Sequence, residues 1–146
     1  MNEEVEFLNF VQKNSQMGVD SIKQLIDIAN DENFKAMLES QYREYRKISE
    51  NAREIMQKYD SDSESNNMLQ KVQTYLMVSI KTLLDKSPDN IAGMLMQGSV
   101  MGIIQIIRRL KQYDGRIEPN ILDLGKKLLH IEERNLEECK KYLGQE

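Results

Sequence analysis

The chain has 146 residues, a length that suits one domain with a hydrophobic core. Hydrophobic residues make up 40% and charged residues 30%, with 7 Gly and 2 Pro, which excludes a disordered chain and a sandwich or barrel of short strands. The 24 acidic and 20 basic residues give a net charge of −4, which does not favour binding to nucleic acid or to anionic membranes through charge.

Two amphipathic segments open the chain. From about residue 3 to residue 29, side chains recur at steps of three and four on one helical face (Leu8, Val11, Ser15, Gly18, Ile22, Leu25 and Ala29). Asn30 and Asp31 interrupt the pattern, and both residue types favour helix N-caps. The pattern then resumes to residue 59 (Phe34, Leu38, Gln41, Tyr45, Ile48, Ala52, Ile55 and Tyr59). So short a break predicts an antiparallel helical hairpin over residues 3–59.

A connecting segment follows over residues 60–86. Residues 60–67 contain no apolar side chain, and we expect a solvated loop there that is the most mobile internal part of the chain. Leu69, Val72, Leu76, Ile80 and Leu83 then predict a shorter helix over about 68–85.

A second hairpin is predicted over residues 87–143. Ser87 and Pro88 favour the start of a helix, as N-cap and first helical residue. This helix reaches about Tyr113, and Asp114 and Gly115 end it. Its apolar stretch, residues 91–110, contains polar residues and three glycines, so we interpret it as a buried helix and not as a membrane span. Glu118 and Pro119 open the last helix.

These patterns predict an all-α fold in a single domain, residues 1–146. Met17-Gly18-Val19 recurs as Met101-Gly102-Ile103, each in the first helix of a hairpin. The connector can run along the outside of the bundle as a crossover, so that the midpoints of all four long helices meet. The first six residues are acidic and unlike a secretory signal, and we expect a cytoplasmic protein.

This pattern resembles the ferritin-like superfamily of four-helix bundles, particularly small rubrerythrin-related proteins with a helical crossover. In that superfamily the first and third long helices each supply one Glu, and the second and fourth each supply Glu-x-x-His, which together hold two iron or manganese ions. We align the first and third long helices on their Met-Gly pairs, and the second and fourth on the residue four after each His position. With this alignment the resemblance implies six corresponding positions here. They are Ser15, Gln41, Glu44, Ser99, Glu132 and Asn135.

The six positions lack the chemistry of an intact di-metal centre. Only Glu44 and Glu132 are carboxylates and none is a histidine, so two divalent ions would exceed the available negative charge. We expect a degenerate site in which Gln41, Glu44, Glu132 and Asn135 hydrogen-bond across the bundle and burial raises the carboxyl pKa. A slip of register in the second helix would bring Tyr42 or Tyr45 inward in place of Glu44.

Other candidate groups favour structural roles. His130 precedes Glu132 by two residues and therefore points away from it, as a surface histidine. Cys139 follows Glu137 and Glu138 on the inward face, which favours a packed, unreactive thiol. Met94 and Met101 share one helical face, which favours core packing over copper binding.

The sequence predicts a non-enzymatic helical bundle that serves as a binding or structural module without a cofactor. The alternative is a divergent iron- or manganese-binding oxidoreductase or storage protein that uses Glu44 and Glu132. A third possibility is a small-molecule sensor that uses the central cavity. We also expect a homodimer, because apolar residues gather on the crossover helix (Met68, Val72, Tyr75, Leu76 and Met77) and a helix outside a bundle buries only one stripe.

Overall fold

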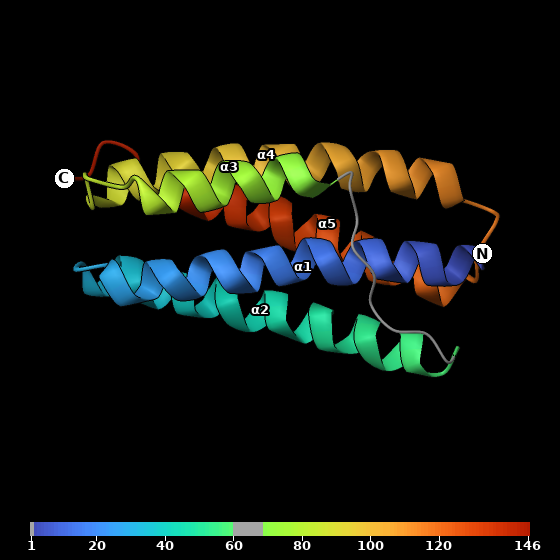
Figure 1. The fold of residues 1–146 in the computed structure, drawn as a ribbon. Coiled ribbons are helices and arrows are strands. Elements are labelled where there is room, and N and C mark those ends of the chain that lie inside the picture. The colour runs from blue at the N-terminus through green and yellow to red at the C-terminus, as the bar shows by residue number, and fades with distance from the viewer. Residues whose placement is uncertain (1, 60–68) are drawn as a thin grey trace.

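The computed structural model describes residues 2–59 and 69–146, and five α-helices account for most of them (Figure 1). The helices are α1 (Glu3–Ile28), α2 (Glu32–Gln57), α3 (Gln70–Lys81), α4 (Pro88–Tyr113) and α5 (Pro119–Lys140). No strand occurs in the described ranges. The prediction of an all-α fold is therefore confirmed.

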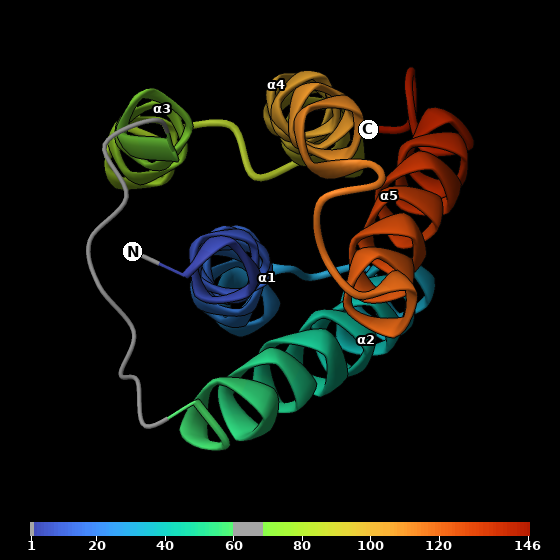
Figure 2. The same cartoon turned by 90° about the vertical axis from the view of Figure 1, so that its right-hand side faces the viewer.

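The four long helices form two hairpins. Helices α1 and α2 run antiparallel and pack closely, as do α4 and α5 (Figures 1 and 2). Helix α3 lies beside α1 and α4 and returns along the bundle, so that α4 runs in the same direction as α2. Helix α1 contacts all four other helices and lies among them in the end-on view of Figure 2.

Side-chain caps begin α2 and α4 where the sequence predicts them. The Asp31 carboxylate accepts a hydrogen bond from the backbone N–H of Phe34 at 2.9 Å, and the Ser87 hydroxyl accepts one from Asn90 at 3.3 Å. Each bond satisfies an amide that has no partner within its helix. At the other end of α4, Gly115 has a φ of 75°, which favours glycine, and it reverses the chain toward α5.

A continuous apolar core fills the space between the helices. It contains Phe7, Leu8, Phe10, Val11, Ile22, Leu25, Phe34, Leu38, Ile91, Ile106, Ile121 and Leu128, each at most 2% exposed. The predicted stripe of α2 is buried from Phe34 through Ala52, whereas Ile55 and Tyr59 are half-buried near its end. The core thus holds both hairpins together along their length.

The connector differs from its prediction in helix length. Helix α3 ends at Lys81 and not near Asp85, and its 12 residues span about 18 Å, roughly half the length of a long helix. Residues 83–86 are not helical and carry the chain to the Ser87 cap. The predicted mobile loop and Met68 lie outside the described residues.

Among the described residues, α4 alone has the length and composition to cross a membrane. In its most apolar window, 39% of the residues are buried in the bundle. Length and composition are weak evidence for a span, because the core helix of a soluble protein passes the same test.

Candidate functional site at the bundle centre

A small cavity lies where the helices meet at mid-length. Its volume is about 30 Å³, and all five helices line it. Its lining includes Asn14 and Gly18 from α1, Tyr45 from α2, Leu76 from α3, Ser99 and Gly102 from α4, and Glu132 from α5. This space suits one or two water molecules and is far smaller than the pockets of several hundred Å³ that bind organic ligands.

Glu132 is the acidic group of the cavity. The residue is 5% exposed, and burial raises the pKa of its carboxyl to about 7. Hydrogen bonds from the side chains of Tyr45 and Ser99 lower this pKa but do not offset the burial. Its Oε2 atom has no hydrogen-bond partner in the part of the chain that the structure describes. Glu132 is therefore a buried carboxyl that gains and loses its proton near neutral pH.

Neutral polar groups surround this carboxyl. Burial, together with the nearby charge of Glu132, raises the pKa of the Tyr45 phenol well above its usual value. Asn14 is 3% exposed, and its amide nitrogen has no partner within the described residues. Both amide atoms of Asn135, which is 1% exposed, likewise lack a well-formed hydrogen bond there. The centre is polar, yet its groups do not form a closed network.

Ser15 and Gln41 are buried but do not line the cavity. The Ser15 hydroxyl donates to the backbone carbonyls of Val11 at 2.8 Å and Gln12 at 3.1 Å, so its own helix satisfies it. The Gln41 amide lies 4.0 Å from the Cys139 sulfur. Of the six predicted positions, only Ser99 and Glu132 face the cavity.

Glu44 does not join the centre, which corrects the predicted alignment. Its side chain is 27% exposed and pairs with Arg134 at the side of the bundle. Tyr45, the next residue, is buried and takes the inward position. The predicted network through Gln41, Glu44, Glu132 and Asn135 is therefore wrong, and the register slip toward Tyr45 matches the observed placement.

Two polar features were missed in the sequence. Asn14 lies one residue before Ser15 and reaches the cavity in its place. The other feature is a chain of hydrogen bonds that joins α1 to α2. The Gln12 side-chain amide donates to the Ser49 hydroxyl at 3.2 Å, and the Ser49 hydroxyl donates to the Gln16 side-chain oxygen at 2.9 Å. Motif alignment overlooked both, although polar residues beside a predicted apolar stripe are a usable signal.

His130 and Cys139 are placed as predicted, and the two methionines only in part. His130 is exposed, and Met94 is 7% exposed within the core, whereas Met101 is only half-buried. Cys139 is 2% exposed, and burial raises the pKa of its thiol to about 12. The buried, protonated thiol packs as an apolar side chain.

The residues at the centre do not fit a pair of divalent cations. One carboxylate faces the cavity, and His130 and Glu44 both lie away from it. Within residues 2–59 and 69–146, no group of three or more His, Cys, Asp or Glu side chains is arranged to hold a metal ion.

Comparison with protein-family models, with curated proteins and with solved structures finds no significant match.

Proposed function

We propose that this chain is a non-enzymatic helical bundle of ferritin-like architecture whose di-metal centre is vestigial, and that it serves as a binding or structural module. The observation that carries the proposal is the single carboxyl, Glu132, at a centre lined otherwise by neutral groups. The order hairpin, crossover, hairpin supports the architectural part of the proposal.

The burial of the two reactive side chains, Glu132 and Cys139, supports a non-enzymatic role. Glu132 is 5% exposed, and the cavity beside it has a volume of about 30 Å³. An organic substrate does not fit beside the carboxyl, and the Cys139 thiol is equally inaccessible at 2% exposed. A central small-molecule sensor site is disfavoured for the same reason.

The alternative is a divergent iron- or manganese-binding protein. It requires Glu44 and Glu132 to share an ion, and the pairing of Glu44 with Arg134 disfavours this arrangement. Among the residues described at the cavity, a single ion at Glu132 would find only neutral oxygen donors besides that carboxylate, from Asn14, Tyr45 and Ser99. One carboxylate compensates a divalent charge poorly in a buried site.

Metal analysis tests the proposal. Protein purified without chelator is expected to contain far less than one equivalent of iron or manganese per chain. Addition of ferrous ion under air is expected to consume oxygen no faster than a buffer control. Stoichiometric iron or manganese, or protein-dependent oxygen uptake, would contradict the proposal and favour the alternative.

A further inference from the structure

An apolar line runs along the side of α4 that faces away from the bundle. Its central residues are exposed: Val100 at 44%, Ile104 at 44% and Ile107 at 37%. With Gly93 and Met96 they recur at steps of three and four, which keeps them on one face of the helix. We call this line, from Asp89 to Lys111, the α4 outer face.

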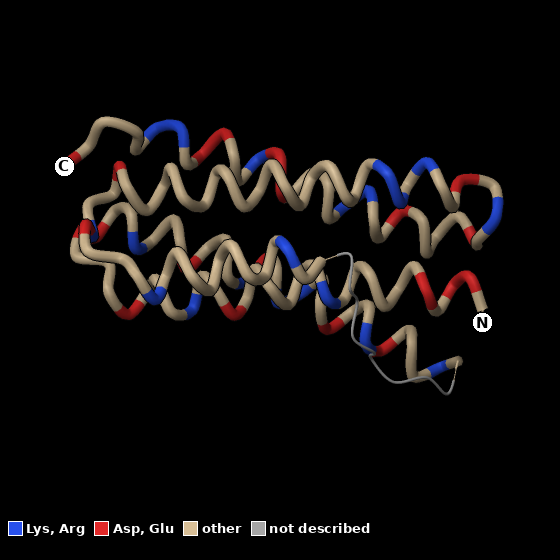
Figure 3. The backbone as a smooth tube through the Cα atoms, turned by 45° about the horizontal axis from the view of Figure 1, so that its top comes forward, with Lys and Arg blue, Asp and Glu red and all other residues tan. Residues whose placement is uncertain are grey.

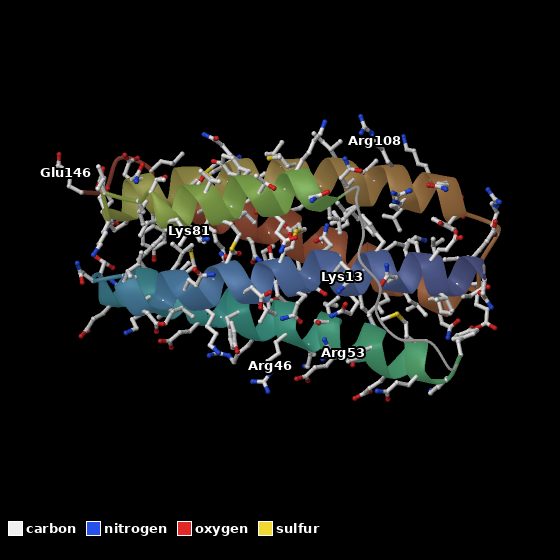
Figure 4. The ribbon with its side chains drawn as sticks, viewed as in Figure 1. Lys13, Arg46, Arg53, Lys81, Arg108 and Glu146 are labelled. Atoms are coloured by element: carbon white, nitrogen blue, oxygen red, sulfur yellow. The ribbon has the colours of Figure 1, made fainter. Side chains whose placement is uncertain are left out.

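The monomer core uses little of the α4 outer face: Met96 is partly buried against the core, whereas Val100, Ile104 and Ile107 are exposed. Ile91, Gly98, Gly102 and Ile106 bury the opposite side of the helix. Helices α3 and α5 lie on either side of α4, with α1 below it (Figure 2). Figure 4 shows Arg108 projecting outward from the same helix. A solvent-facing helix side is normally polar, so an exposed apolar line marks an interaction surface.

Opposite charges stand at the two ends of this face. No charged residue occurs between Asp89 and Arg108, and Figure 3 shows the uncharged stretch between an acidic and a basic end. Asp89 and Lys111 are both exposed and lie equally far along the helix from Val100. A second α4 packed antiparallel across Val100 would bring each Asp89 to the other copy's Lys111. A parallel arrangement would place like charges together.

The same register matches a large side chain to an open position. Gly93 would face Ile107 of the second copy, and a Cβ atom at Gly93 would meet only the Leu143 side chain, at 4.0 Å. A groove of about 580 Å³ lies beside this position, and its lining includes Asp89, Gly93 and Leu143. The Ile107 side chain can therefore enter the space above Gly93, as knobs enter holes in packed helices.

We propose that the α4 outer face is a homodimer interface in which two copies of α4 pack antiparallel across Val100. This inference rests on the proposed binding role and names its partner. It also moves the interface from the predicted site on α3, where Val72 and Leu76 are buried within the monomer at 4% and 7% exposed.

Sedimentation equilibrium of the full chain tests this interface. The parent is expected to show twice the chain mass of 17.1 kDa at high micromolar concentration. Ile104→Glu should shift the mass to that of one chain, because it buries a charge in the interface. Val78→Glu is the matched control, since Val78 is 54% exposed on α3, and it should remain dimeric. Circular dichroism verifies that both variants are folded.

Charge reversal tests the antiparallel register. Lys111→Glu is expected to raise the dimer dissociation constant by about tenfold, and the double variant Asp89→Lys with Lys111→Glu should recover most of this loss. Asp89 also accepts a hydrogen bond from the Gly144 amide, and Asp89→Lys removes that bond. A change at Lys111 cannot restore it, so tighter dimerisation of the double variant would report the pairing of residues 89 and 111 and not this bond.

Two outcomes would overturn the inference, namely a monomeric parent and a dimeric Ile104→Glu variant. A monomeric parent that binds phosphatidylcholine vesicles through α4 would show in addition that this face contacts lipid. A monomer free of metal would contradict the interface and leave the proposed metal-free centre standing, so the two failures are distinguishable.

Discussion

Among single residues that the structure describes, Glu132 is the acid whose ionised form destabilises the folded chain, because its carboxyl is buried. No Lys or Arg is among the described residues that line the cavity, and its neighbours Tyr45 and Ser99 only partly compensate for lost hydration. When the proton leaves, the charge remains in a cavity with room for one or two waters. The protonation state of this one group therefore couples pH to the stability of the bundle.

The pH dependence of unfolding is the first prediction. The folded-state pKa of Glu132 is about 7, above the unfolded value near 4.5. The folded state thus holds a proton that the unfolded state has lost, and this group's contribution falls as the pH rises from about 4.5 to about 7. The full effect is about 3 kcal/mol, reached above neutral pH. Urea unfolding at pH 5, 6, 7 and 8 measures it.

Glu132→Gln should remove this dependence. The amide keeps the size of the side chain without its charge, so the variant is expected to lie close to the parent at pH 5 and to exceed it in stability by a growing margin up to pH 8. Glu133→Gln is the control, because Glu133 is exposed, and it should follow the parent. Identical pH profiles for the parent and Glu132→Gln would contradict the burial of this charge.

Helix contacts depend on a close approach between α5 and α1. A Cβ atom at Gly125 would strike the Phe7 ring and lie 3.1 Å from Leu110, and Phe7 is only 1% exposed. Gly125→Ala is therefore expected to lower the free energy of unfolding by about 1–3 kcal/mol despite the better helix propensity of alanine.

Gly93→Ala supplies the comparison for the same chemical change. In the single chain the position is open on α4, so in the Ile104→Glu background, where the proposed interface is absent, alanine should gain up to about 1 kcal/mol from helix propensity. Chemical denaturation of both variants measures the difference. Equal effects at the two glycines would show that helix propensity decides the outcome and that the contact with Phe7 does not.

The start of α2 gives a second prediction for an element. Asp31 caps the Phe34 amide, and its second oxygen accepts from the Gln145 side chain at 2.9 Å. Asp31→Ala should cost about 1 kcal/mol or slightly more through loss of the cap. The exposed neighbour Asn30, replaced by alanine, should change the free energy of unfolding by less than about 0.5 kcal/mol.

Across the whole molecule, periodicity predicted more of the fold than of the site. The stripes, the caps at Asp31 and Ser87, and the turn at Gly115 identified four long helices because each signal is local. The length of α3 was overestimated, since Leu83 extends the apolar pattern beyond Lys81, where the helix stops. The apolar periodicity of a connecting segment does not show at which residue its helix must end for the chain to reach the next helix.

The centre was predicted less well because it depends on the rotation of each helix. The apolar stripe of α2 already included Tyr45, which is buried, whereas the motif alignment selected Glu44, one residue earlier. One residue is a rotation of about 100°, enough to carry a side chain from the centre to the surface. The alignment placed Glu132 at the centre, where it lies, because on α5 it follows Leu124 and Leu128 at steps of four, so the apolar periodicity and the motif agree.

The measurement that tests the central claim most directly is the stability of the parent and Glu132→Gln at pH 7, with manganese and with chelator. A metal-free centre predicts that manganese does not stabilise the parent, and that the variant equals or exceeds it under both conditions. A parent stabilised by manganese, with a variant that is weaker in metal yet equal in chelator, would show that Glu132 holds a cation.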